Sequence, residues 1–193
     1  MSLRFIIPLV LSFVCLAVPA WADFQAGMDA TNREDYATAL REWRPLAEQG
    51  DALAQYNLGV LYRKGRGVPQ DDVQARQWYE KAAAQGQAKA QFNLGTLYFN
   101  GAGVPKDYRQ ALRWFRLAAD QGEALAQTKI AIMYDDGQGV QQDIVQAHKW
   151  YSLAATNGDK PAAELRDALA KQMTPAQIAE AQKLAREWKP IKK

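Results

Sequence analysis

A 36-residue internal repeat constrains the fold of this chain more than any other feature. Glycines recur at this interval, and the segments between them align without gaps: Gly50, Gly86, Gly122 and Gly158. Other residues recur in register, namely Ala54/Ala90/Ala126, Tyr62/Tyr98/Tyr134, Asp71/Asp107/Asp143, Ala75/Ala111/Ala147 and Trp78/Trp114/Trp150. Self-similarity at such a period is typical of architectures in which each unit packs on its neighbours. We therefore expect the recurring residues to form the core.

Each copy contains two apolar patterns with the spacing of an amphipathic helix. In the first copy, the first pattern comprises Ala54, Leu58, Leu61 and Tyr62, and the second comprises Ala75, Trp78, Tyr79, Ala82 and Ala83. The sequence therefore predicts an all-α fold, an α/α solenoid of helix-turn-helix repeats with capping helices at both ends.

The phrase GAGVPKDY (101–108) separates the two patterns and recurs in related form at Gly65 and Gly137. Gly101 can adopt the left-handed conformation that ends a helix, and a proline cannot continue one. Asp107 can then cap the next helix, with Gln110 reaching back to complete a capping box. These residues predict a turn.

Binding of a phosphate or a metal ion is not supported by this phrase. No strand precedes it, and it lacks the third glycine or the lysine of nucleotide-binding loops. The copy between Asp135 and Asp143 lacks the alternating acids and the closing glutamate of a calcium loop. We predict no cofactor and no metal.

Gly59 and Gly95 lie inside the first predicted helix, where glycine costs roughly 1 kcal/mol relative to alanine. We expect the paired helix, with its tryptophan and tyrosine, to approach closely at these positions. Ala131, the next smallest residue, stands there in the third copy. A bulky residue at position 95 should therefore destabilise the fold.

The flanking segments extend the repeat pattern in weaker form. Trp43 lies one position after the expected tryptophan register, and Thr174, Pro175 and Gln177 mark the start of a final helix. We divide the chain into a signal peptide (1–22), N-terminal capping helices (23–49), three repeats (50–85, 86–121 and 122–157) and a C-terminal capping pair with a basic tail (158–193).

The first 22 residues have the features of a secretory signal. Arg4 precedes an apolar run at 5–18, and Ala20-Trp21-Ala22 offers a cleavage site. We expect a periplasmic protein, or alternatively a secreted one. Cleavage would remove Cys15, the only cysteine, and no later segment contains about 18 consecutive apolar residues. We predict no disulfides and no membrane insertion after cleavage.

The charge balance does not indicate nucleic-acid binding. The chain has a net charge of +3, and loss of Arg4, the only charged residue in the signal segment, leaves +2. A basic stripe is expected in a nucleic-acid-binding protein, and the short tail at 189–193 is basic. A solvated end is the simpler interpretation of that tail.

The repeat residues resemble those of the Sel1-like family, which is related to the tetratricopeptide repeats. The shared pattern is A-x-x-x-L-G-x-x-Y, then G-x-G-V, D, A, W-Y, A-A and G, and this chain departs from it at Ala131 and Gln141 and at the ends. The resemblance implies a right-handed solenoid of helix pairs that generally holds other proteins.

Catalytic residues are scarce after the signal segment. Ser152 and His148 are the only serine and histidine there, and their spacing places them on one helix face. A nucleophile also needs an orienting group and an oxyanion site, and none is evident. We predict that the protein is not an enzyme. The alternative is an envelope hydrolase or cell-wall-acting factor, like cysteine-rich family members linked to penicillin, although their paired cysteines are absent here.

Positions that vary between copies of the first helix are candidates for binding a partner. They form stripes with spacings of four and three, flanked by two asparagines and a lysine. The stripe residues are Tyr56, Val60 and Arg63; Phe92, Thr96 and Phe99; and Thr128, Ile132 and Asp135; beside them lie Asn57, Asn93 and Lys129.

Two interpretations of these variable positions remain open. They can lie on the concave face of the solenoid and bind a protein or peptide, or they can pack between neighbouring units. We predict a non-catalytic scaffold or adaptor of the bacterial envelope that binds a partner on the concave surface of its first helices.

Overall fold

The computed structural model describes residues 23–190, and within this range all regular structure is helical. The helices are α1 (Phe24–Asn32), α2 (Tyr36–Glu48), α3 (Ala52–Lys64), α4 (Asp72–Ala84), α5 (Ala88–Asn100), α6 (Tyr108–Ala119), α7 (Ala124–Asp136), α8 (Ile144–Thr156), α9 (Lys160–Ala170) and α10 (Pro175–Glu187). The all-α prediction is confirmed. The predicted signal segment, with Cys15, and the last residues of the basic tail lie outside the described residues.

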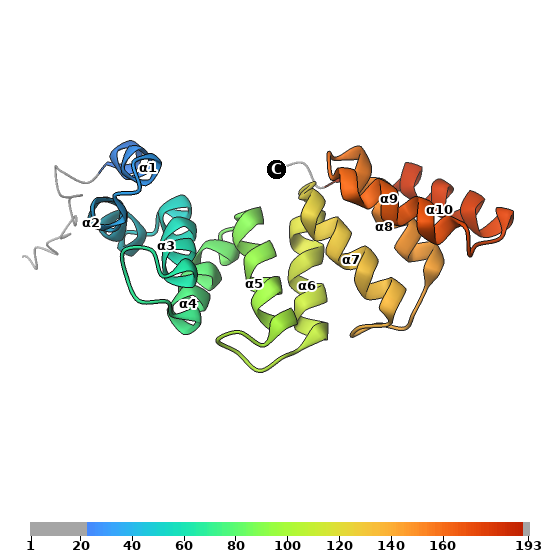
Figure 1. Cartoon of the computed structure of the whole chain (residues 1–193), viewed down its shortest axis with the longest axis horizontal. Coiled ribbons are helices and arrows are strands. Elements are labelled where there is room, and N and C mark those ends of the chain that lie inside the picture. The colour runs from blue at the N-terminus through green and yellow to red at the C-terminus, as the bar shows by residue number, and fades with distance from the viewer. Residues whose placement is uncertain (1–22, 191–193) are drawn as a thin grey trace, which may run out of the picture.

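The helices form a linear array. From α1 to α9 each helix packs on the one before and the one after it, and α10 packs back on α8. Figure 1 shows the array bending, so that both ends rise above the middle helices α5 and α6. This arrangement is the predicted helix-pair solenoid.

The repeated glycine phrase ends one helix and starts the next, as predicted. Gly101 has a φ of 72° in the left-handed region and caps α5. The Asp107 carboxylate accepts hydrogen bonds from the backbone N–H groups of Arg109 and Gln110, at 2.9 and 3.0 Å. The Gln110 side chain does not bond back, because the Asp107 N–H already donates to the carbonyl of Tyr98 at 2.9 Å.

The second glycine of the phrase has a role that the sequence did not reveal. A Cβ atom on Gly103 would lie 2.5 Å from the carbonyl carbon and oxygen of Asp72, at the start of α4. A Cβ atom on Gly139 would lie 2.7 Å from the carbonyl carbon and 2.9 Å from the carbonyl oxygen of Tyr108, at the start of α6. The loop of each unit therefore packs on the backbone of the preceding unit, which leaves no room for a side chain.

The repeated tryptophans are less buried than predicted. Only Trp150 is buried, whereas Trp78 and Trp114 are half-buried. The fully enclosed ring belongs to the next residue in each copy: Tyr79, Phe115 and Tyr151 are 0%, 0% and 2% exposed. One residue turns the side chain by about 100° around the helix. The tryptophans therefore lie at the boundary between units; Trp78, for example, packs against the cluster built from α1, α2 and α3.

A buried amide hydrogen bond links consecutive units and was also missed. Gln91 donates through Nε2 to the Ala83 carbonyl at 3.2 Å, and its Oε1 accepts from Gln121 Nε2 at 2.8 Å. Equivalent bonds occur in the other units, through Gln55 and Gln85 and through Gln127 and Asn157. Each amide gives a second hydrogen bond to a carbonyl at the end of the preceding helix, which also accepts the N–H of the turn glycine.

The C-terminal end is closed as the sequence predicts. Thr174 caps α10, and its bonds with Gln177 run in both directions to form a capping box. Trp188, just after α10, packs edge-on against Trp150 with ring centroids 6.1 Å apart. This contact covers the only one of the three repeat tryptophans that is buried.

Candidate functional site

The structure places the predicted binding residues on the first helices of three consecutive units, α3, α5 and α7. All of them are half-buried, so each side chain both contacts the protein and reaches solvent. We call this set the first-helix row: Tyr56, Asn57, Val60, Arg63, Phe92, Asn93, Thr96, Phe99, Thr128, Lys129, Ile132 and Asp135.

The aromatic members of the first-helix row pack on the second helix of their own unit. Tyr56 lies on Tyr79, with ring centroids 6.1 Å apart, and Phe92 lies on Phe115 at 5.7 Å. Phe99 also contacts Phe115, at 6.4 Å. These ring contacts lie within one unit rather than between neighbouring units, and the same side chains keep the partial exposure that binding needs.

The amide and lysine positions point toward the first helix of the preceding unit. Asn57 Nδ2 lies 4.0 Å from Met28 Sδ on α1. Lys129 Nζ lies 5.5 Å from the centre of the Phe99 ring on α5. Asn93 lines a hollow beside α3. The equivalent residues Asn57, Asn93 and Lys129 thus face the groove between successive first helices.

That hollow, which we call the α3–α5 hollow, has a volume of about 420 Å³. Its lining residues come from α3, α4 and α5: Tyr56, Val60, Arg63, Lys64, Tyr79 and Asn93. Sequence reasoning assigned Tyr79 to packing and did not single out Lys64. The sequence does mark Lys64 as a variable position, because the pair Arg63–Lys64 is replaced by Phe99–Asn100 in the second copy and by Asp135–Asp136 in the third.

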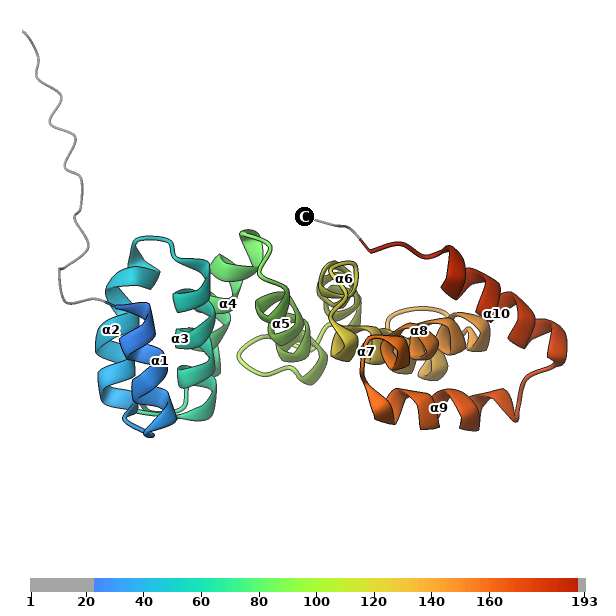
Figure 2. The same cartoon turned by 90° about the horizontal axis from the view of Figure 1, so that it is seen from above.

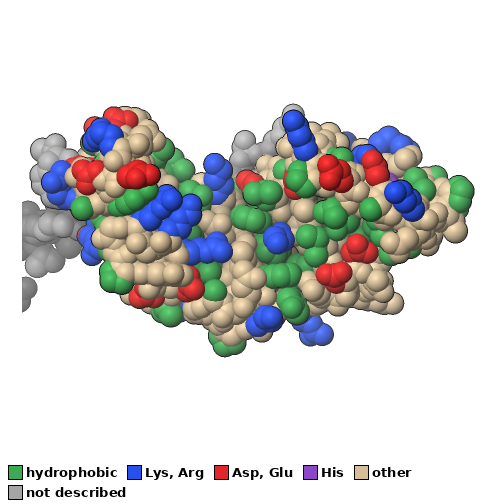
Figure 3. All heavy atoms as spheres, viewed as in Figure 1, with side chains coloured by type: hydrophobic (Ala, Val, Ile, Leu, Met, Phe, Trp, Pro, Cys, Tyr) green, Lys and Arg blue, Asp and Glu red, His purple; other side chains and the backbone are tan. Residues whose placement is uncertain are grey.

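The charge at the end of the first helix therefore changes along the array, from basic in α3 through neutral in α5 to acidic in α7. Figure 3 shows acidic and basic side chains interspersed over the face drawn, with hydrophobic side chains between them. The surface shown carries no continuous basic stripe of the kind expected for nucleic-acid binding.

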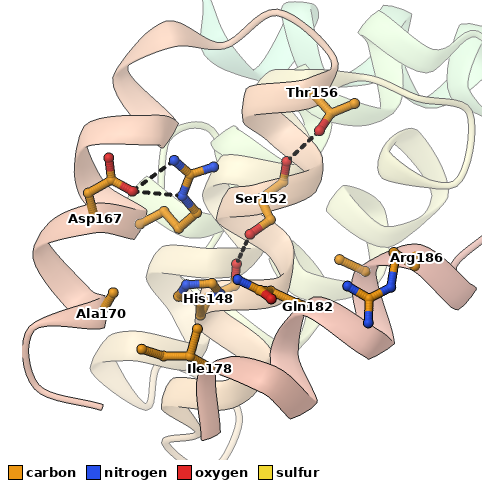
Figure 4. Close-up of a pocket in the computed structure, with 10 residues that line it drawn as sticks. His148, Ser152, Thr156, Asp167, Ala170, Ile178, Gln182 and Arg186 are labelled. Carbon is orange, nitrogen blue, oxygen red and sulfur yellow. Dashed lines mark hydrogen bonds and ion pairs between the residues drawn. The ribbon is translucent and has the colours of Figure 1, made fainter. Parts of the chain in front are cut away.

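A second hollow, of about 490 Å³, lies at the C-terminal end (Figure 4). Helices α9 and α10 lie on either side of α8 (Figure 2), and all three helices contribute lining residues. Its lining residues are His148, Ser152, Thr156, Arg166, Asp167, Ala170, Ile178, Gln182, Ala185 and Arg186. The predicted serine and histidine thus share a hollow rather than an open helix surface.

Their geometry does not form a nucleophile and base pair. The Ser152 hydroxyl donates to the backbone carbonyl of His148 at 2.8 Å, not to the imidazole. His148 is only 3% exposed, and its Nδ1 atom makes no hydrogen bond to any residue in the described range. The nearby Asp167 carboxylate is bound to Arg166 at 2.7 Å. The hydroxyl is therefore held by its own helix.

The buried His148 should make folding stability depend on pH. Burial lowers the pKa of His148, and the nearby Arg166 guanidinium lowers it further. Between this depressed value and the ordinary value of about 6.5, the unfolded chain binds more protons than the folded protein. Stability is therefore expected to fall as the pH drops through this range, which thermal unfolding followed by circular dichroism would measure. His148→Gln, which cannot gain a proton, should lack this component, and equal pH slopes in both proteins would contradict it.

Two kinds of feature are absent from the described residues, a cluster of metal ligands and a membrane-spanning helix. Between residues 23 and 190, no three potential metal ligands of the His, Cys, Asp or Glu type gather at one place. No helix in that part of the chain has the length and apolar character needed to cross a bilayer.

Comparison with known proteins identifies the repeat. The Sel1 repeat model matches residues 52–87, 88–123 and 124–159. Each match begins on the first residue of α3, α5 or α7. No curated protein is similar enough in sequence to count as a match.

Among the solved structures that match this chain, three show the resemblance. A Sel1 repeat protein from Oxalobacter formigenes is 38% identical, with a TM-score of 0.69 over 72% of this chain and 58% of its own. A protective antigen, c5321, of uropathogenic Escherichia coli is 32% identical, with a TM-score of 0.60 over 85% of this chain and 44% of its own. Cysteine-rich protein B of Helicobacter pylori, 19% identical, shares the fold with a TM-score of 0.54 over 68% of this chain and 96% of its own.

Proposed function

Because the chain belongs to the Sel1 repeat family, we propose that it is an exported, non-catalytic scaffold that binds a protein or peptide partner. The binding surface is the first-helix row on the concave side of the array. The signal-like segment at the start of the sequence supports export to the periplasm, or release from the cell.

The observation that carries this proposal is the half-buried state of the first-helix row. A side chain that is anchored by packing loses little further freedom when a partner binds, which lowers the entropic cost of association. Tyr56, Phe92 and Phe99 are anchored in this way by ring contacts. Aromatic and arginine side chains fixed in such positions are the usual hot spots of protein interfaces.

Site-specific crosslinking in the native host tests the proposal. A photoreactive residue at Phe99 or Asn93 is expected to capture the same partner segment, identified by mass spectrometry. The control is Leu117 on α6, which is 47% exposed but lies outside the row. Capture of the same proteins from position 117, or no capture from the row, would contradict a binding surface on α3, α5 and α7.

A double variant, Asn57→Ala with Asn93→Ala, tests the row with a defined ligand. Both amides lie in grooves between first helices, where they can bond an extended peptide backbone. Affinity for the crosslinked segment, made as a synthetic peptide, is expected to fall about tenfold or more, since two neutral hydrogen bonds are lost. Circular dichroism should show an unchanged fold. Unchanged affinity would contradict the assignment of these amides.

A further inference from the structure

The α3–α5 hollow differs from the rest of the first-helix row in its chemistry. Three of its polar side chains are hydrogen-bond donors, and none of them carries negative charge: the Arg63 guanidinium, the Lys64 ammonium and the Tyr79 hydroxyl. Neither cation forms an ion pair with any residue between 23 and 190. A site built in this way favours an acceptor that carries negative charge.

Tyr79 provides an independent indication that the hollow binds a hydrogen-bond acceptor. Its side chain is fully buried, and no described residue lies in hydrogen-bonding geometry with its hydroxyl, although the Arg63 and Asn93 side chains approach it. The ring is fixed against α3, because a Cβ atom on Gly59 would lie 2.5 Å from it. A buried hydroxyl without a partner costs stability, so a ligand acceptor at this place would remove a penalty.

The protonation state of Tyr79 suits it to donate a hydrogen bond. Burial raises the pKa of its phenol, and the nearby Arg63 charge only partly opposes this. The hydroxyl therefore keeps its proton across the physiological range. Asn93, on the other wall of the hollow, adds an amide group that can donate as well.

We infer that the α3–α5 hollow binds a carboxylate group of the peptide partner. This inference rests on the proposed function and names the chemistry that one end of the first-helix row recognises. The planar Arg63 guanidinium can bind both carboxylate oxygens, while Tyr79 donates to one of them. Tyr56 and Val60 supply the apolar wall along which the methylene groups of a glutamate side chain would lie.

The equivalent positions of the following units cannot bind a carboxylate, so the site occurs only at the α3 end of the array. In the second unit, Phe99 and Phe115 replace the arginine and the tyrosine and pack together at 6.4 Å. In the third unit, Asp135 and Asp136 replace the two cations and would repel a carboxylate. An acidic group of the partner is therefore directed to the α3 end, and the α7 end favours neutral or basic residues.

Binding of paired synthetic peptides to the purified protein tests the inference. The probes are fluorescein-labelled, amidated octapeptides in which one glutamate is placed at each position in turn, matched by glutamine versions. A third set carries a free C-terminal carboxylate and no glutamate. Fluorescence anisotropy should show about tenfold tighter binding for one glutamate register or for the free C-terminus, which distinguishes the two sources of the carboxylate.

Two variants link this preference to the hollow. Tyr79→Phe removes only the hydroxyl and is expected to lose about tenfold in affinity for the carboxylate peptide, while its thermal midpoint stays the same or rises. Arg63→Gln should lose at least as much. Lys89→Gln, a control on the exposed side of α5, should bind like the parent. A marked loss of stability in Tyr79→Phe would show that the hydroxyl already has a partner and would overturn the assignment.

The outcomes separate this inference from the proposed function. If glutamate and glutamine peptides bind equally, or if Tyr79→Phe and Arg63→Gln keep the preference, the carboxylate site is wrong and the scaffold function stands. If no peptide binds and crosslinking from the row captures nothing, both are wrong.

Discussion

A Gly95→Leu variant is expected to unfold about 10 °C below the parent protein, because position 95 has no room for a side chain. A Cβ atom there would lie 2.7 and 2.8 Å from ring atoms of Phe115 and 3.2 Å from the Ala111 carbonyl oxygen. Phe115 is fully buried and cannot move away without disturbing its unit. Overpacking of this kind costs about 3 kcal/mol, which is worth about that shift in a chain of this size.

A control variant separates this loss of thermal stability from the mere addition of an apolar side chain to α5. Lys89→Leu places the same residue on the exposed side of the same helix, so its midpoint should stay within about 2 °C of the parent. Thermal unfolding followed at a helical signal compares all three proteins. A Gly95→Leu protein that melts with Lys89→Leu would show that α5 and α6 do not need the close approach seen here.

The fold was largely predictable because the residues that define each helix pair recur in several copies of the repeat. The glycine and aspartate positions that end and begin helices each recur in register, and Gly101 and Asp107 act as expected. A residue that recurs in every copy is not there by chance, because it must serve either the packing of the helices or the direction of the chain. What it did not distinguish is which of two adjacent aromatic residues is enclosed. The choice between Trp114 and Phe115 depends on the rotation of α6 against its neighbours, which spacing alone leaves open by one residue.

The candidate site was less predictable, for a physical reason. Repeat variation correctly marked the positions that reach solvent, but a hollow depends on side chains from three helices. Tyr79 is a conventional core residue in the sequence, and only its position beside Arg63 and Asn93 shows that its hydroxyl lines a hollow. The sequence pattern likewise places His148 on a helix surface, whereas α9 and α10 pack on α8 and His148 is buried. Non-local packing of this kind has no periodic signal.

A Gln91→Leu variant is expected to lose about 1 to 3 kcal/mol of unfolding free energy, although leucine suits a buried position and a helix. The substitution removes the 3.2 Å bond from Nε2 to the Ala83 carbonyl and one of the two acceptors of Gln121 Nε2, which keeps the Leu117 carbonyl at 3.3 Å. Gln91 is only 4% exposed, so little water is available to replace these bonds. The Ala83 carbonyl keeps its 2.9 Å bond from the Gly86 N–H, so the expected loss is that of the two hydrogen bonds made by the Gln91 amide, and burial of the apolar leucine side chain recovers only part of it.

Comparison with two further variants shows whether the bond network, rather than glutamine itself, is responsible. Gln77→Leu on the exposed surface of α4 should change the unfolding free energy by less than about 0.5 kcal/mol. Gln121→Ala breaks the outer bond and an exposed bond to the Leu117 carbonyl but keeps the buried bond to Ala83, so it should cost less than Gln91→Leu. Because both residues act on the same chain of bonds, the double variant should be less destabilised than the sum of the single ones. Strictly additive effects, measured by urea unfolding, would mean that the two amides stabilise their units independently and that the link between α5 and α6 is not cooperative.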